Sequence, residues 1–184
     1  TMAGFARFLD PHRLVVTSPD GSELIVEGER FLIAVGTVPF HPDNIDFTDP
    51  GIMDSDQVVD VPRLPRSLTV VGAGVIGIEY ATIFSALDVA VTVIEPRSSF
   101  LDFVDREIID EFVHQLRDRG VTFRLGVPVE TVERGSDGRV VTMLKDGRVV
   151  RTEMLLYCVG RMGATADLGL DKCELTTDAR GRLS

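Results

Sequence analysis

The apolar residues of this chain follow one pattern before residue 40 and a different one after residue 66. In the first part, short apolar stretches are separated by turn residues such as Asp10-Pro11 and Asp20-Gly21, a pattern typical of antiparallel strands. We predict strands over 4–9, 13–17, 23–26 and 31–35. Residues 41–66 are rich in proline, aspartate and glycine, and we interpret them as a linker with a helical turn near 54–59.

The second part alternates apolar, β-branched runs with segments of helical periodicity. Strands are predicted over 68–71, 90–94, 121–125 and 154–159, and helices over 75–87 and 106–119. The first helix has apolar residues at positions 76, 80, 83, 84 and 87. Short alternating segments joined by Asp-Gly turns, at 129–134, 139–145 and 148–152, predict an antiparallel three-stranded excursion. The fold class is therefore α/β, a Rossmann-like doubly wound parallel sheet with this excursion and with flanking β strands.

Composition narrows the classes of protein that remain. Hydrophobic residues make up 44% of the chain, no apolar run approaches the ~18 residues of a membrane span, and no basic and apolar leader opens the sequence. A net charge of -10 argues against a nucleic-acid surface. Cys158 and Cys173 are too far apart for a redox pair and too few for a disulfide framework or a zinc site, so we expect a cytosolic protein with Cys158 in its core.

Three glycines follow the strand at 68–71 and carry the first chemical signal. Gly72, Gly74 and Gly77 have the G-x-G-x-x-G spacing, in which the first glycine makes a tight turn, the second admits a pyrophosphate and the third lets the helix pack on the strand. The pyrophosphate would lie at the helix N-terminus, where free N–H groups and the helix dipole favour an anion. Val75 and Ile76, between the second and third glycine, belong to the same predicted cofactor contacts.

An acidic residue in the expected place supports this interpretation. Glu95 ends the second strand about 20 residues beyond the glycines, where a carboxylate binds the 2′-hydroxyl of an adenine ribose. The alternative is a solvated residue at the end of a strand. Arg97 could pair with a 2′-phosphate and admit NADP as well. We predict a dinucleotide site that binds NAD at least as well as NADP.

Residues 70–81, which include Glu79, resemble the NAD(P)H motif of the two-dinucleotide-binding flavoprotein disulfide reductase superfamily. The dipole of the predicted helix would stabilise Glu79 in any case, and the resemblance implies that this residue also lies near the nicotinamide. Residues 33–39, with Gly36, resemble the A-T-G-S-x-P segment of the same superfamily, which lines the FAD site, although Val35 and Thr37 replace the usual Thr and Ser.

Two further stretches extend the resemblance along the chain. Residues 155–163 resemble the return strand of the superfamily with its Gly-Arg pair, which implies that Gly160 approaches the nucleotide. Residues 78–84 and 100–105 are similar to the soluble pyridine nucleotide transhydrogenases. Members of that group are cytosolic FAD enzymes that pass hydride equivalents between NADPH and NAD through the flavin, without a redox-active disulfide. We predict no acid, base or nucleophile in this chain, because hydride chemistry belongs to the cofactors.

The resemblance divides the chain into an incomplete FAD domain and a pyridine nucleotide domain. We assign residues 1–40 to partial FAD-domain strands, 41–66 to the linker, 67–160 to the NAD(P)-binding domain and 161–184 to a return segment toward the FAD domain. A second glycine motif for FAD, a C-x4-C pair, a G-D motif and a C-terminal interface domain do not occur in the 184 residues. We therefore expect an inactive central piece of a homo-oligomeric enzyme, able to bind a pyridine nucleotide but not to retain FAD.

Two alternatives stay open. A dihydrolipoamide dehydrogenase or mercuric reductase relative would share every motif of the superfamily. A non-catalytic Rossmann domain that senses NAD(H) and signals through a partner is an alternative from another class, and a second, flavin-binding glycine motif in the parent gene would count against it.

Overall fold

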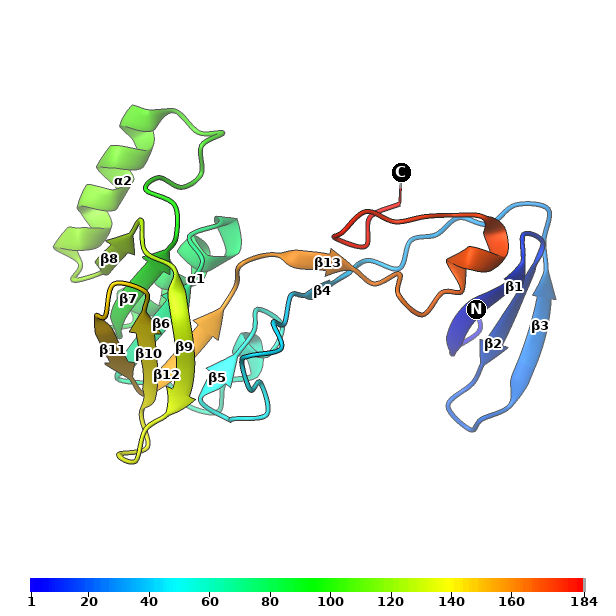
Figure 1. Cartoon of the computed structure of the whole chain (residues 1–184), viewed down its shortest axis with the longest axis horizontal. Coiled ribbons are helices and arrows are strands. Elements are labelled where there is room, and N and C mark those ends of the chain that lie inside the picture. Colours follow the sequence, from blue (N-terminus) through cyan, green and yellow to red (C-terminus); the bar gives the residue numbers. More distant parts are fainter. Residues whose placement is uncertain (184) are drawn as a thin grey trace. The chain divides into compact units, whose positions relative to one another are not determined.

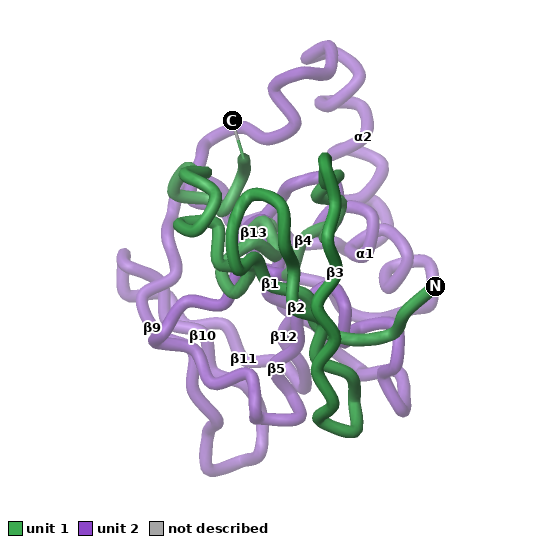
Figure 2. Tube along the Cα trace, turned by 90° about the vertical axis from the view of Figure 1, so that its right-hand side faces the viewer, with its two compact units in different colours: residues 1–38, 161–184 green, residues 39–160 purple. Residues whose placement is uncertain are grey.

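A computed structural model describes residues 1–183 of the chain (Figure 1). The chain forms two compact units, which Figure 2 shows in different colours. Residues 39–160 form one unit, and residues 1–38 form the other together with the segment that begins at Arg161. Each unit is described by itself.

The unit of residues 39–160 is built on a parallel five-stranded sheet. Its strand order is β5 (Ile52–Met53), β12 (Met154–Tyr157), β6 (Ser67–Val71), β7 (Ala90–Glu95) and β8 (Thr122–Leu125). The chain moves outward from β6 to β8 and then returns to the other side of β6 through β12. The point where the strand order reverses therefore lies between β6 and β12, the place where open α/β sheets bind ligands. The predicted α/β fold is confirmed.

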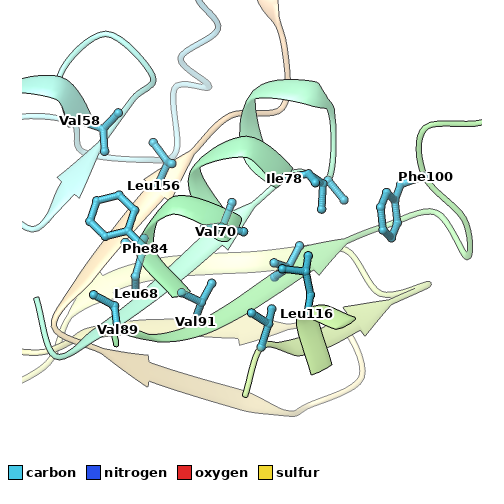
Figure 3. Packing of buried hydrophobic residues seen from close by; sticks show 14 of the residues in the cluster. Val58, Leu68, Val70, Ile78, Phe84, Val89, Val91, Phe100, Leu116 and Leu156 are labelled. Atoms are coloured by element: carbon cyan, nitrogen blue, oxygen red, sulfur yellow. The ribbon is translucent and has the colours of Figure 1, made fainter. Parts of the chain in front are cut away.

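Two helices cover one face of this sheet. They are α1 (Val75–Ala86) and α2 (Arg106–Asp118). Asp105 caps α2 because its Oδ1 accepts a hydrogen bond of 2.9 Å from the N–H of Glu107. Alternate residues of the strands face the helices, so that Leu68 and Val70 of β6 pack with Val91 of β7 in the larger hydrophobic core (Figure 3).

The predicted antiparallel excursion covers the opposite face. It consists of β9 (Val129–Arg134), β10 (Val140–Leu144) and β11 (Val149–Thr152), in the order β11-β10-β9. Val132 and Val140 of this small sheet pack on Val71 and Leu155 of the parallel sheet, in a second core cluster. The parallel strands are buried on both faces by these two layers, which explains their continuous apolar runs.

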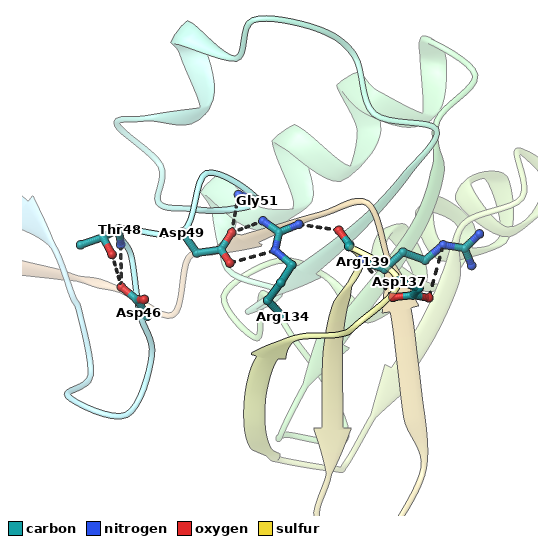
Figure 4. A network of polar contacts seen from close by, with 8 residues as sticks. Asp46, Thr48, Asp49, Gly51, Arg134, Asp137 and Arg139 are labelled. Atoms are coloured by element: carbon teal, nitrogen blue, oxygen red, sulfur yellow. Dashed lines mark hydrogen bonds and ion pairs between the residues drawn. The ribbon is translucent and has the colours of Figure 1, made fainter.

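Ion pairs join the linker to this scaffold. Arg134 on β9 binds Asp49, with Nε 2.9 Å from Oδ2, and also donates to the carbonyl oxygen of Gly138 (Figure 4). Hydrogen bonds from Arg134, which outweigh the effect of burial, hold the pKa of Asp49 below its ordinary value. The linker is thereby ordered against the excursion, and its strand β5 pairs with β12.

The unit with the N-terminus contains an antiparallel meander of β1 (Phe5–Asp10), β2 (Arg13–Thr17) and β3 (Glu23–Glu27). The 3₁₀ helix η2 (Leu170–Cys173) contributes Leu170 to a small core with Phe8 and Leu168. The short strands β4 (Thr37–Pro39) and β13 (Arg161–Gly163) pair with each other. These three meander strands agree closely with the predicted ones.

Other predicted elements need correction. The prediction of a strand over 31–35 is wrong, because no strand of the described chain pairs with this stretch, and Leu32 is 93% exposed. The helical turn near 54–59 is the 3₁₀ helix η1 (Val58–Asp60), and β5 before it was not predicted. The segment after residue 163 contains η2 and a bridge between Thr177 and Leu183, two features that its weak periodicity did not indicate.

The apolar face assigned to α1 also needs correction. Ile83 and Leu87 are 43% and 50% exposed, whereas Ile78, Ala81 and Phe84 are buried against the sheet. The helix has apolar residues around most of its circumference, so its periodicity could not identify the face that packs. No helix among residues 1–183 combines the length and the apolar character needed to cross a membrane.

Candidate functional site

The glycine turn between β6 and α1 is shaped by close packing against the strand that returns beside it. Gly72 has a φ of +101°, and a Cβ built there would lie 2.6 Å from the carbonyl oxygen of Cys158. A Cβ on Gly77 would lie 1.9 Å from the carbonyl oxygen of Gly72. Side chains at these two positions are therefore excluded, and the predicted tight turn and helix–strand packing are both present.

The middle glycine differs from the other two. Gly74 precedes α1 with an ordinary φ of -72°, and a Cβ built there would have no atom within 4 Å. The N–H groups of Val75 and Ile76 lie in the first turn and have no partner within α1, and Gly74 has no side chain to cap them. The turn thus leaves open space at a helix N-terminus, an environment that favours an anion.

Glu95 ends β7 beside this turn and is 3% exposed. Its Oε2 accepts a hydrogen bond of 2.8 Å from the N–H of Ala73, inside the glycine turn. Its Oε1 accepts hydrogen bonds from the backbone N–H of Arg97 (3.1 Å) and from Nε of that residue (2.7 Å), and Nη2 of Arg97 lies 3.2 Å from Oε2. Burial alone would raise the pKa of Glu95, but the bonds from Arg97 and Ala73 outweigh it and hold that pKa below its ordinary value.

The alternative of a solvated strand-end residue does not fit this geometry. The Glu95 carboxylate is buried and bonded to the glycine turn, whereas the Arg97 side chain is 56% exposed. The contact with Ala73 was missed by the sequence reasoning, because a backbone N–H group leaves no signal in the residue type. The pairing of Glu95 with Arg97 could have been expected from their opposite charges and their spacing of two residues.

Cys158 follows β12 and packs against the larger core, as predicted. Its Sγ lies 3.4 Å from the carbonyl oxygen of Val71 and within 3.7 Å of that of Gly72. Burial, with a smaller contribution from the charge of Glu95, raises the pKa of this thiol to about 12. The thiol therefore stays protonated near neutral pH and fills space beside the turn.

The remaining predicted site residues are not all brought together. Glu79 is exposed on α1, and Gly160 follows β12 with its carbonyl oxygen accepting a hydrogen bond of 3.1 Å from the N–H of Phe40. Gly36 belongs to the other unit, where its carbonyl oxygen accepts the N–H of Ala164. The structure thus groups the three glycines, Val75, Ile76, Glu95 and Arg97 at the carboxyl ends of the neighbouring strands β6 and β7.

One histidine contacts a buried carboxylate that is distant in the sequence. His41 places Nε2 2.7 Å from Oδ2 of the buried Asp54, and its ring stacks on Phe47 with centroids 3.8 Å apart. His41 and Asp54 are 13 positions apart in the sequence, so local spacing gave no sign of this contact.

The parallel sheet, its reversal of strand order and the glycine turn together define a Rossmann-like fold. The chain matches the pyridine nucleotide-disulphide oxidoreductase family over residues 4–184 and belongs to that family. It is 43% identical over 183 residues to a soluble pyridine nucleotide transhydrogenase of Mycobacterium tuberculosis, and 42% identical over 182 residues to one of Escherichia coli. These alignments cover 99% of the chain and 39% of either relative, so the chain spans about two fifths of their length.

Solved structures of flavoproteins have the same fold. The HOCl-induced flavoprotein disulfide reductase RclA from Escherichia coli superimposes with a TM-score of 0.89 at 30% identity, over all of this chain and 41% of that one. LpdA from Mycobacterium tuberculosis superimposes with a TM-score of 0.85 at 27% identity, over 98% of this chain and 38% of that one.

Proposed function

We propose that this chain is the NAD(P)-binding part of an FAD-dependent oxidoreductase that passes hydride equivalents between NADPH and NAD. The observation that carries the proposal is the open space over Gly74, within a turn that is closed at Gly72 and Gly77. A turn of this shape at the N-terminus of α1 leaves room for a pyrophosphate beside unpartnered N–H groups. The high identity to proteins named soluble pyridine nucleotide transhydrogenases supports the choice of reaction.

In this proposal the three glycines, with Val75 and Ile76, bind the pyrophosphate of the pyridine nucleotide. Glu95 binds the hydroxyls of the adenine ribose, and Arg97 binds a 2′-phosphate when one is present. Glu79 and Gly160 lie toward the nicotinamide. Gly36 of the other unit lines the FAD site of the complete enzyme, which we expect to be a cytosolic homo-oligomer.

The residues of this chain position the nucleotide and supply no reacting group. The pyridine nucleotide and FAD carry the hydride chemistry when they are bound. The thiol of Cys158, with a pKa raised to about 12, is suited to packing and not to redox exchange. Orientation of the nucleotide by a rigid turn is therefore the contribution of this chain.

Calorimetric titration of the chain with NAD and with NADP tests the proposal. We expect one molecule of either nucleotide to bind per chain, NAD at least as tightly as NADP. Failure to bind either nucleotide would overturn the proposed function, and a much tighter complex with NADP would overturn the predicted preference.

A second candidate is a reductase that uses a redox-active disulfide, such as a dihydrolipoamide dehydrogenase or a mercuric reductase. The likeness to a solved flavoprotein disulfide reductase favours it. The two candidates differ in a region outside these 184 residues, because the disulfide enzymes carry a C-x4-C pair near their flavin. Sequencing the parent gene upstream distinguishes them, since such a pair would exclude the transhydrogenase.

A further inference from the structure

The carboxylate of Glu95 has no free acceptor position. Oε1 accepts two hydrogen bonds, both from Arg97, and Oε2 accepts one from Ala73 and one from Arg97, at distances between 2.7 and 3.2 Å. An ionised carboxylate offers about four lone-pair sites, so all of them are occupied. A ribose hydroxyl can reach Glu95 only if one of these bonds opens.

The four bonds differ in how easily they can open. The N–H of Ala73 is part of the glycine turn, and Ala73 is fully buried. The backbone N–H of Arg97 is fixed by the turn after β7, which also holds the carbonyl oxygen of Arg97 2.9 Å from the N–H of Gly126. The guanidinium of Arg97 ends a long, flexible side chain that is 56% exposed, so it can rotate into solvent without disturbing the fold.

We propose, on the basis of the proposed function, that Arg97 is a movable cap on Glu95 and determines which pyridine nucleotides the site accepts. With NAD, the ribose hydroxyls take the positions on Glu95 that the guanidinium leaves. With NADP, the displaced guanidinium binds the 2′-phosphate and compensates for the negative charge beside the carboxylate. The cap therefore weakens the binding of NAD and strengthens that of NADP.

Opposite shifts in the two affinities test the cap. In the chain with Arg97→Ala, we expect NAD to bind about tenfold more tightly, because no ion pair has to open, and NADP about tenfold more weakly, because its phosphate has lost a partner. Calorimetry measures both dissociation constants. The matched control is Arg119→Ala, which removes the same charge from the exposed end of α2, and it should leave the ratio of the two affinities unchanged.

The variant Glu95→Gln tests the same proposal by changing the carboxylate that Arg97 binds. The amide keeps an oxygen for the N–H of Ala73 but loses the charge that holds the guanidinium, so Arg97 is free for a phosphate. We expect NADP to bind several-fold more tightly and NAD more weakly than in the original chain. If Arg97→Ala lowers the unfolding temperature, Arg97→Met replaces it, because the methionine keeps the apolar stem over Glu95 and removes the guanidinium.

The outcomes separate the cap from the function on which it rests. If the original chain binds both nucleotides and removal of the guanidinium weakens both or leaves NAD unchanged, the cap is wrong and the proposed function stands. If the original chain binds neither nucleotide, both proposals are wrong. A gain for NAD together with a loss for NADP supports the cap.

Discussion

Gly74 and Gly77 belong to the same motif, but of these two positions the protein itself requires glycine only at position 77. A side chain at Gly77 would collide with the backbone of Gly72, so this position is fixed by the packing of α1 on β6. A side chain at Gly74 would meet no atom and has an allowed backbone conformation, so no protein atom excludes it and only the proposed pyrophosphate would. Substitution of Gly77 is therefore expected to affect mainly the stability of the fold, and substitution of Gly74 mainly the binding of the proposed nucleotide.

We expect Gly74→Ala to leave stability nearly unchanged and to weaken nucleotide binding at least tenfold, since its Cβ enters the proposed pyrophosphate space. Gly77→Ala should destabilise the fold by about 1–3 kcal/mol or more, because a backbone shift is needed to relieve overpacking. Urea unfolding and calorimetry of both variants measure the two effects. Equal losses of stability in the two variants would contradict the distinction.

At the scale of elements, an ion-pair cluster joins the starts of two neighbouring strands. Glu153, just before β12, accepts hydrogen bonds from the N–H of Arg66 (3.0 Å) and from Nε of the same residue (2.7 Å), just before β6. Arg63 adds a bond of 3.2 Å, and the N–H of Glu153 donates to Oγ of Ser67. These bonds, led by the N–H of Arg66, lower the pKa of Glu153 to about 2.

This cluster predicts a pH-dependent contribution to stability. A carboxylate whose pKa is lower in the folded state stabilises the protein above its unfolded pKa, here near 4.5, and loses that effect as the pH falls toward 2. We expect Glu153→Gln to destabilise the chain at pH 7, with a difference from the original that narrows between pH 4.5 and 2. Urea unfolding at several pH values measures it, with Glu130→Gln on the exposed side of β9 as the control. A difference that stays constant with pH would contradict the prediction.

Most elements of the core were predictable, and the exceptions share a cause. The order of strands and helices from β6 to β12 follows from local periodicity and from turn residues such as Gly120, which follows α2 with a φ of +86°. Local periodicity does not identify the packing face of α1 or the two-residue strand β5. Each of these depends on contacts with strands far away in the sequence. The stretch 31–35 has the composition of a strand, but a strand also needs an adjacent strand with which its backbone can form hydrogen bonds.

At the scale of the whole molecule, the chain is much shorter than the relatives that it matches. The chain covers 39% of the length of the two soluble pyridine nucleotide transhydrogenases named above. Its 184 residues contain one G-x-G-x-x-G motif, which we assign to the pyridine nucleotide, and an enzyme with two dinucleotides needs a second such site.

We therefore expect the purified chain to lack stoichiometric FAD and to show no hydride transfer between NADPH and an NAD analogue. The visible absorption bands of flavin measure the flavin content of the preparation directly. The matched control is the full-length parent prepared in the same way, which should be yellow and active. Tight, stoichiometric FAD in the chain of 184 residues would contradict the assignment of its single glycine motif.

The sequence by itself determined the β-α-β order, the glycine turn and the acidic residue at the end of β7, because each is encoded in neighbouring residues. Only the tertiary structure decided that Gly74 faces open space while Gly72 and Gly77 face the returning strand, and that Glu95 is saturated by Ala73 and Arg97. These features depend on how the glycine turn, the end of β7 and the residues after β12 pack against one another. A motif can indicate that such a site exists, but packing decides which of its positions remain available to a ligand.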